Sequence, residues 1–426
     1  MKVDRTTPPP VSDFVRLSIP AMKSEVVADG ITLNIIRTGE TPANRISLLW
    51  NYGASQCQGS FAPSLVPQMM MQATTKLSGA EIVDKIDFLG AFLNHNVGTS
   101  YSSFDALSLN QFTGDMLEIL NDIVCNPIFP EDRFEAIKRK ALAQYDLKNS
   151  RTRFVASEAL TELLAGKNHP YARKITRRDI EETTIENVRD AWRKGIFKTA
   201  INIFASGNIT ESLEKELINF STSLRPVPTE INMHVVVPYC PEPPCRIFIE
   251  SPNARQSSVA VGIPTIPRTN PDYIPLRIAV TALGGYFGSR LMTNIREEKG
   301  LTYGINAYLG GTFEGASINI NADCDKSYVE DVLKEINIEM EKMASAPLPE
   351  DEFRRLRSYY MTIIASTLES FKSIGEHYES QITVGIPENY FDEQQSVLES
   401  ITPEDIRAMA EKYFITSEAR TVIVGA

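Results

Sequence analysis

The sequence is poor in cysteine and histidine, and it has neither a long apolar run nor an excess of positive charge. Its 426 residues include five cysteines and four histidines. A sparse, odd number of cysteines suits a reducing compartment better than a disulfide framework. No apolar stretch approaches the ~20 residues that cross a bilayer, and residues 1–10 lack the apolar core of a signal peptide. We therefore expect a cytoplasmic protein that does not span a membrane.

The charge balance restricts the partners that the protein can have. Acidic residues outnumber basic ones, giving a net charge of −11, and the two signs are interspersed. Such a surface argues against nucleic acid or an anionic membrane as the partner. Cys240 and Cys245 flank Pro-Glu-Pro-Pro, but no second cysteine pair and no histidine lies nearby. We therefore do not interpret these two cysteines as metal ligands.

The sequence contains a long internal repeat, which indicates two similar domains. Pro-Glu-Asp opens a helical segment at Pro130 and again at Pro349, and a strand-like apolar run ends at Gly207 and again at Gly425. Both pairs are separated by roughly 220 positions, far more than the period of a solenoid. A chain of this length is large enough to bury two cores. We predict domains over residues 1–225 and 246–426, joined by a proline-rich linker over residues 226–245.

Local patterns within each half predict an α+β fold. Residues 46–50 and 102–109 have the character of strands, whereas residues 78–89 have apolar side chains at helical spacing and a capping box at Ser78. Residues 131–165 and 350–383 are predicted to be helical. Strands and helices grouped in this way favour a largely antiparallel sheet with helices packed on one face, repeated twice to form a clamp-like unit.

Several motifs resemble those of one peptidase family. The segments Gly-Gly-Tyr-Phe-Gly-Ser-Arg-Leu (284–291) and Ile-Arg-Glu-Glu-Lys-Gly-Leu-Thr-Tyr-Gly (295–304) are similar to the second half of the insulinase/pitrilysin family of zinc peptidases. The metal motif of this family is His-x-x-Glu-His. Further matches in the family's order are Gly90–Asn94, Cys125–Pro130 and His169–Tyr171. The resemblance thus covers nearly the whole chain.

The resemblance also places the family's metal ligands on residues that cannot replace them. Counting back from Gly90 puts the two histidines on Ser64 and Gln68 and the catalytic glutamate on Pro67. Counting forward puts the distal glutamate on Gln144, give or take one residue. Zinc requires imidazole, thiolate or carboxylate donors, and proline has no carboxyl group to act as general base. We expect neither catalytic residues nor metal ligands in this chain.

A structural interpretation accounts for the degenerate segment. Ser64 would cap a helix, Pro67 would lie in its first turn, and Leu65, Met69 and Met70 would pack inward. This interpretation needs no ligand.

The second half retains two residues with an implied role. In two-chain members of the family, the subunit without the metal motif supplies an arginine and a tyrosine to the peptide held at the other subunit's zinc. The resemblance places these residues at Arg296 and Tyr303, which can both donate hydrogen bonds to a peptide carbonyl. The alternative is purely structural, because Arg296 suits the end of a helix and Tyr303 would share a strand face with Leu301, Ile305 and Ala307.

The leading hypothesis is therefore a non-catalytic subunit of a heterodimeric zinc endopeptidase. The resemblance implies a homologous partner chain that carries the intact metal motif and its zinc, and extended peptides as substrates. The resemblance leaves open the alternative that this chain forms a homodimer when the partner is missing. One alternative is a structural or assembly subunit without a peptidase role, similar to core subunits of respiratory complexes. The other is a self-sufficient peptidase with an unanticipated metal site.

Overall fold

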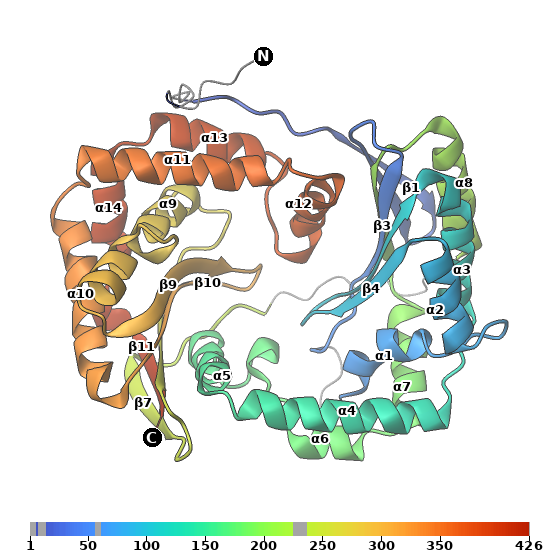
Figure 1. The fold of residues 1–426 in the computed structure, drawn as a ribbon, viewed down its shortest axis with the longest axis horizontal. Helices are drawn as coiled ribbons and strands as arrows, with labels where there is room; N and C mark the ends of the chain where they lie inside the picture. The colour runs from blue at the N-terminus through green and yellow to red at the C-terminus, as the bar shows by residue number, and fades with distance from the viewer. Residues whose placement is uncertain (1–5, 7–13, 56–60, 225–236, 426) are drawn as a thin grey trace.

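The chain folds into two halves that face each other, each built from a mixed sheet and a set of helices (Figure 1). The computed structural model describes residues 6, 14–55, 61–224 and 237–425. The predicted α+β class is confirmed. Within these described ranges, no helix combines the length and the apolar character needed to cross a bilayer.

The first sheet has six strands in the order β1-β2-β6-β3-β5-β4. Strands β2 and β6 run parallel, and all other neighbours are antiparallel. The strands are β1 (Met22–Ala28), β2 (Ile31–Arg37), β3 (Ala43–Trp50), β4 (Phe92–Val97), β5 (Ser102–Leu109) and β6 (Ile201–Gly207). The strands predicted at residues 46–50 and 102–109 correspond to β3 and β5.

The second sheet repeats this arrangement with five strands in the order β7-β11-β8-β10-β9. Only β7 and β11 run parallel, just as β2 and β6 do. The strands are β7 (Cys245–Glu250), β8 (Ser257–Thr265), β9 (Thr302–Gly311), β10 (Ala316–Cys324) and β11 (Arg420–Gly425). The glycines of the predicted repeat, Gly207 and Gly425, end the equivalent strands β6 and β11. The prediction of two homologous units is therefore confirmed.

The helices of the first half mostly cover one face of its sheet. They are α1 (Ala62–Met70), α2 (Gly79–Phe88), α3 (Thr113–Cys125), α4 (Glu131–Asn149), α5 (Thr152–Ala165), α6 (Arg177–Glu182), α7 (Ile185–Ala191) and α8 (Glu211–Ser223). A π-helical turn, η3 (Trp192–Ile196), follows α7. The predicted capping box is present, since the Ser78 side chain accepts from the Glu81 backbone N–H and α2 begins at the next residue.

The helices of the second half have the same general arrangement. They are α9 (Tyr273–Gly284), α10 (Val329–Ser345), α11 (Glu350–Ser366), α12 (Phe371–Thr383), α13 (Tyr390–Ser400) and α14 (Pro403–Tyr413). A π-helical turn, η4 (Met292–Glu298), lies between α9 and β9. Helices α4 and α11, which the repeated Pro-Glu-Asp motif predicts, each begin directly after its proline, Pro130 or Pro349.

Each of the two long segments predicted as helical is broken into two helices, and the second helix crosses to the other half. Residues 131–165 form α4 and α5, and residues 350–383 form α11 and α12. Helix α5 packs on β8 and β11 of the second sheet, whereas α12 packs on β6 and β3 of the first. The break has a packing reason, because a straight continuation would leave the apolar side of the second helix without a sheet to cover.

The exchanged helices cover the sheet faces that each half's own helices leave open. In β3, Leu48 belongs to the core of the first half, whereas Leu49 packs with Ile374 and Tyr378 of α12. Successive strand residues point to opposite faces, so the two cores lie on opposite sides of the sheet. Coverage of both faces explains why β3 has consecutive apolar residues instead of strict alternation.

Glycine allows a close approach at both exchanged helices. A Cβ atom at Gly262 of β8 would lie 2.8 Å from Cδ1 of Leu164 in α5. A Cβ atom at Gly375 of α12 would lie 2.8 Å from Oγ of Ser206 in β6. These separations are too short for real side chains, so the absence of a Cβ lets helix and sheet pack closely.

The His-Pro-Tyr segment joins the two halves through a partly buried polar network. His169 accepts a hydrogen bond from the backbone N–H of Tyr171 on Nδ1, so its Nε2 donates to the carbonyl of Val237 at 2.7 Å. The Tyr171 hydroxyl donates to Glu314 at 2.9 Å and lies 2.8 Å from Oγ of Ser100. Burial raises the pKa of Tyr171, which keeps this hydroxyl protonated.

Replacing Tyr171 with phenylalanine should lower the free energy of unfolding by about 1–3 kcal/mol, the usual cost of removing one partner of a buried hydrogen bond. Urea unfolding followed by circular dichroism measures this change. Tyr328→Phe is the control, because Tyr328 is 42% exposed and its change should cost far less. Equal losses in the two variants would mean that the Tyr171 hydroxyl does not contribute to holding the halves together.

The predicted linker lies mostly outside the described residues, since 225–236 are not among them. Strand β7 begins at Cys245, so the last predicted linker residue belongs to the second sheet. The domain limits of 225 and 246 stay a prediction.

Candidate functional site

The three degenerate positions of the metal motif lie on α1, at the inner side of the first half. Pro67 is buried, and Ser64 and Gln68 are partly buried. The prediction that Ser64 caps this helix is wrong, because the helix begins at Ala62 and Pro63 occupies its first turn. Pro67 accordingly lies inside the helix. The predicted inward packing of Leu65, Met69 and Met70 is confirmed.

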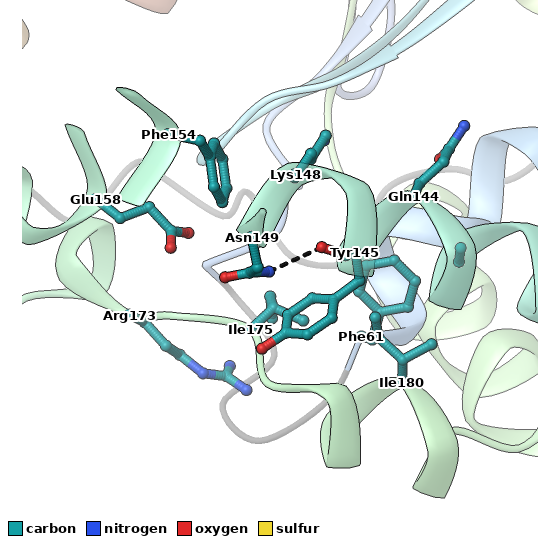
Figure 2. A pocket seen from close by; sticks show the side chains of 11 residues that line it. Phe61, Gln144, Tyr145, Lys148, Asn149, Phe154, Glu158, Arg173, Ile175 and Ile180 are labelled. Carbon is teal, nitrogen blue, oxygen red and sulfur yellow. Dashed lines mark hydrogen bonds between the residues drawn. The ribbon is translucent and has the colours of Figure 1, made fainter. Parts of the chain in front are cut away.

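The fourth degenerate position, Gln144, lies on α4, which packs against α1. Gln144 is exposed and lies at the rim of a cavity of about 220 Å³ where α4 meets α5. Figure 2 shows its side chain extending away from the Tyr145 ring, and Phe61 and Ile180 also line the cavity. Glu158 also lines this cavity, and burial raises its pKa. Sequence reasoning did not identify this cavity.

The side chains at these four positions do not fit a zinc ion. Gln68 and Gln144 offer neutral amides, Ser64 offers a hydroxyl, and Pro67 has no donor atom. Zinc sites in proteins use imidazole, thiolate or carboxylate ligands. Across the described residues, no three histidine, cysteine, aspartate or glutamate side chains are grouped as metal ligands. These four side chains therefore provide no ligand set that would hold a metal-bound base.

The purified chain is expected to hold no stoichiometric zinc, because its donor set is too weak to compete with water and buffer. Inductively coupled plasma mass spectrometry after dialysis measures the metal content. A Gln68→Ala, Gln144→Ala variant is the matched control, and its trace zinc should equal that of the original chain. A stoichiometric zinc content that falls in this variant would contradict the degenerate-site interpretation.

Arg296 lies in the last turn of η4, at the end that precedes β9. Its guanidinium carbon lies 5.0 Å from the centre of the Phe287 ring, a cation–π contact. Phe287 is itself 62% exposed. No carboxylate within the described ranges pairs with Arg296, so its hydrogen-bond donors stay directed to the surroundings.

Tyr303 is the second residue of β9, and it is 87% exposed. The structural alternative, in which Tyr303 shares the core face with Ile305 and Ala307, is wrong. The register explains why: Thr302 pairs with Cys324 and Gly304 with Asp323, which leaves Tyr303 as the extra residue of a β-bulge. One inserted residue shifts the alternation, so Tyr303 turns outward while Thr302 and Ile305 are buried.

Arg296 and Tyr303 thus project from two elements that pack against each other, η4 and β9. Strand β9 is the edge of the second sheet and pairs only with β10 among the described strands. Further along the same strand, Tyr308 is 48% exposed. The arrangement combines two hydrogen-bond donors, exposed aromatic rings and a strand edge that no second described strand covers.

Sequence reasoning missed Phe287 and the bulge. Phe287 lies in a glycine-rich turn, where no pattern distinguishes an exposed aromatic side chain from a buried one. Gly304, directly after Tyr303, was the available signal, because glycine inside a strand often marks a bulge.

Comparison with known proteins identifies the family. Residues 64–178 match the description "Insulinase (Peptidase family M16)", and residues 183–360 match "Peptidase M16 inactive domain". An uncharacterized zinc protease of Streptomyces coelicolor is 23% identical over 425 residues, covering 96% of this chain and 86% of the relative. The probable inactive metalloprotease YmfF of Bacillus subtilis is 22% identical over 312 residues, or 70% of each chain.

Solved structures show the same fold. A peptidase M16 inactive domain from Pseudomonas fluorescens has a TM-score of 0.84 at 21% identity, covering 95% of this chain and 98% of that chain. A protease from Helicobacter pylori has a TM-score of 0.86 at 14% identity, covering 96% and 100%. These matches show that the chain belongs to the insulinase family, peptidase family M16, as a non-catalytic member.

Proposed function

We propose that this chain is the non-catalytic subunit of a heterodimeric zinc endopeptidase. A homologous partner with the intact His-x-x-Glu-His motif would supply the zinc and the general base. This chain would close the chamber and present Arg296 and Tyr303 to the peptide substrate. The sparse cysteines and the acidic surface support a cytoplasmic location for such a complex.

The exposure of Tyr303 carries the proposal. A tyrosine at the second position of a strand with buried Ile305 and Ala307 would ordinarily belong to the core, and the bulge removes it from there. Bulges recur next to functional sites because they redirect a side chain. With Arg296 on the adjoining turn, a guanidinium and a phenol both donate from one surface. Two such donors suit a peptide carbonyl on which negative charge develops during hydrolysis.

The β9 edge supports an extended peptide as the substrate. An exposed strand edge offers backbone groups that a peptide can pair with, and alternate side chains of that peptide then contact the sheet face. Tyr303 and Tyr308 would provide aromatic surface for apolar side chains of the peptide. The peptide backbone would therefore supply most of the affinity, and the complex would discriminate only weakly between peptide sequences.

The relatives support a protein without catalysis of its own. YmfF is described as a probable inactive metalloprotease, and residues 183–360 match a domain described as inactive. Other relatives are described as zinc proteases, which is the role proposed here for the partner chain.

Co-expression with a homologous chain that carries the intact motif tests the proposal. Cleavage of a quenched fluorescent peptide should require both chains, and neither chain alone should be active. Size-exclusion chromatography with light scattering establishes whether the two chains form a heterodimer or this chain forms a homodimer. A stable complex whose peptidase activity does not depend on this chain would instead favour a structural or assembly subunit.

A further inference from the structure

A second cavity, separate from the proposed substrate surface, lies between helices α9, α11, α12 and α13. Its volume is about 450 Å³, which is in the range of small-molecule sites. Polar side chains predominate in its wall. The residues that matter here are Arg277, Ile363, Glu369, Ser373, Glu376 and Ile386.

Arg277 of α9 is held in one orientation by neighbouring polar side chains. Its Nη1 donates to the hydroxyl of Tyr390 at 2.8 Å and to Oε1 of Gln394 at 3.3 Å. The Tyr360 hydroxyl donates to the same Gln394 oxygen at 3.4 Å. Tyr360, Tyr390 and Gln394 are all buried. The guanidinium is therefore fixed by its surroundings before any ligand binds.

Arg277 also lines the cavity, and the other edge of its guanidinium carries Nε and Nη2. Within the described ranges, no residue accepts a hydrogen bond from its Nε or Nη2, and no carboxylate pairs with the side chain. Neither nitrogen is among the fully buried atoms that lack a partner, so both keep some accessible surface. The structure thus orients a cation by one edge and leaves the opposite edge open to a ligand.

The same edge binds carboxylates elsewhere in this chain. Arg290 donates from Nε and Nη2 to the two carboxylate oxygens of Glu352, at 2.8 and 3.1 Å. Arg153 donates from the same two nitrogens to a single oxygen of Asp323, Oδ2. The two-oxygen pairing of Arg290 with Glu352 matches the planar geometry of a carboxylate and is stronger than a single hydrogen bond.

We propose that this cavity binds a carboxylate ligand through Nε and Nη2 of Arg277. Ile363 and Ile386 provide apolar contact for the remainder of the ligand. Glu369 and Glu376, both exposed, also line the cavity and disfavour a second negative charge. The ligand is therefore a monocarboxylate whose remainder is neutral or positive. The C-terminus of a short peptide and a free amino acid share this chemistry.

The site lies on a helix that joins the two halves. Ser373 and Glu376 of α12 line the cavity, whereas Ile374 and Tyr378 of the same helix pack on the first sheet. A ligand held between Arg277 and α12 stabilises the position of this helix. Binding should therefore raise the melting temperature of the whole chain, because it favours the folded state alone.

Isothermal titration calorimetry on the full chain tests the proposal with three probes: the tripeptide Ala-Ala-Leu, its C-terminal amide, and free leucine. The tripeptide acid should bind at least about tenfold more tightly than the amide, since only the acid forms the charge-assisted pair. Binding of the acid but not of leucine supports a peptide C-terminus as the ligand. Equal binding of leucine supports a free amino acid. Equal binding of acid and amide, or binding of inorganic phosphate alone, overturns the proposal.

Variants separate the site from general stability. Arg277→Lys keeps the charge but loses the paired donors, and it should weaken binding at least about tenfold. Ser373→Trp should block the cavity from α12 without changing Arg277. Arg355→Lys, on the exposed face of α11, is the matched control and should bind as the original chain does. Unchanged affinity in a folded Arg277→Lys or Ser373→Trp protein contradicts the proposal.

Discussion

Replacing Arg45 with methionine is expected to lower the free energy of unfolding by about 3–5 kcal/mol, the cost of leaving a buried charge without its partner. Arg45 of β3 is 2% exposed and donates from Nη1 to Glu379 of α12 at 2.6 Å and from Nη2 at 3.1 Å. It also pairs with Asp105 of β5. Loss of the guanidinium leaves two carboxylates close together at the contact between the halves.

The pH dependence distinguishes this mechanism from a simple loss of packing. Burial raises the pKa of Glu379, and the hydrogen bonds from Arg45 oppose that rise. The Arg45→Met variant lacks these hydrogen bonds, so the pKa of Glu379 in the folded state lies further above its value in the unfolded state. A raised carboxyl pKa means that the folded state binds the proton more readily, so stability increases as the pH falls. The variant should therefore recover part of its lost stability between about pH 7 and pH 5.

Guanidinium chloride unfolding at several pH values provides the measurement. Arg407→Met is the control, because Arg407 and Glu411 form an ion pair at the surface of α14 and such pairs contribute at most about 1 kcal/mol. A double variant, Arg45→Met with Glu379→Leu, should recover part of the loss by removing one of the two unpaired carboxylates. The interpretation fails if Arg45→Met is no more destabilising than Arg407→Met.

Replacing Arg296 with alanine is expected to reduce kcat/KM of the two-chain peptidase by about 100-fold, the scale of removing one donor to a developing oxyanion. Tyr303→Phe removes only the hydroxyl. It should reduce kcat/KM by about tenfold, because a neutral donor stabilises the developing oxyanion less than a charged donor does. The expectation rests on the proposed function. Both side chains donate from a surface with few competing partners, and neither is needed to fill a core.

Steady-state cleavage of a fluorogenic peptide by the purified complex gives these ratios. Arg255→Ala and Tyr328→Phe are matched controls, since Arg255 is an exposed arginine in the β7–β8 connection and Tyr328 is an exposed tyrosine away from β9. Light scattering of each variant complex checks that assembly is unchanged. Activity that persists in an intact Arg296→Ala, Tyr303→Phe complex would remove the proposed role of these residues.

The sequence by itself determined the repeat and the family. Pro130 and Pro349 start equivalent helices because a proline preceding the first turn disrupts no helical hydrogen bond. Gly207 and Gly425 end equivalent strands. The predicted absence of a metal site rests on side-chain chemistry, since Ser64, Pro67, Gln68 and Gln144 supply neither an imidazole nor a carboxylate.

Tertiary structure decided how the halves are joined and which side chains are exposed. Residues 152–165 and 371–383 have helical sequences, but nothing local indicates that each helix packs on the opposite sheet. The outward position of Tyr303 depends on its register against Asp323 and Cys324, which are about 20 residues away along the chain. The orientation of Arg277 depends on side chains of two other helices. Local sequence patterns indicate backbone preference and amphipathicity. Strand-pairing register and the enclosure of a side chain by its neighbours arise only when distant segments of the chain pack together.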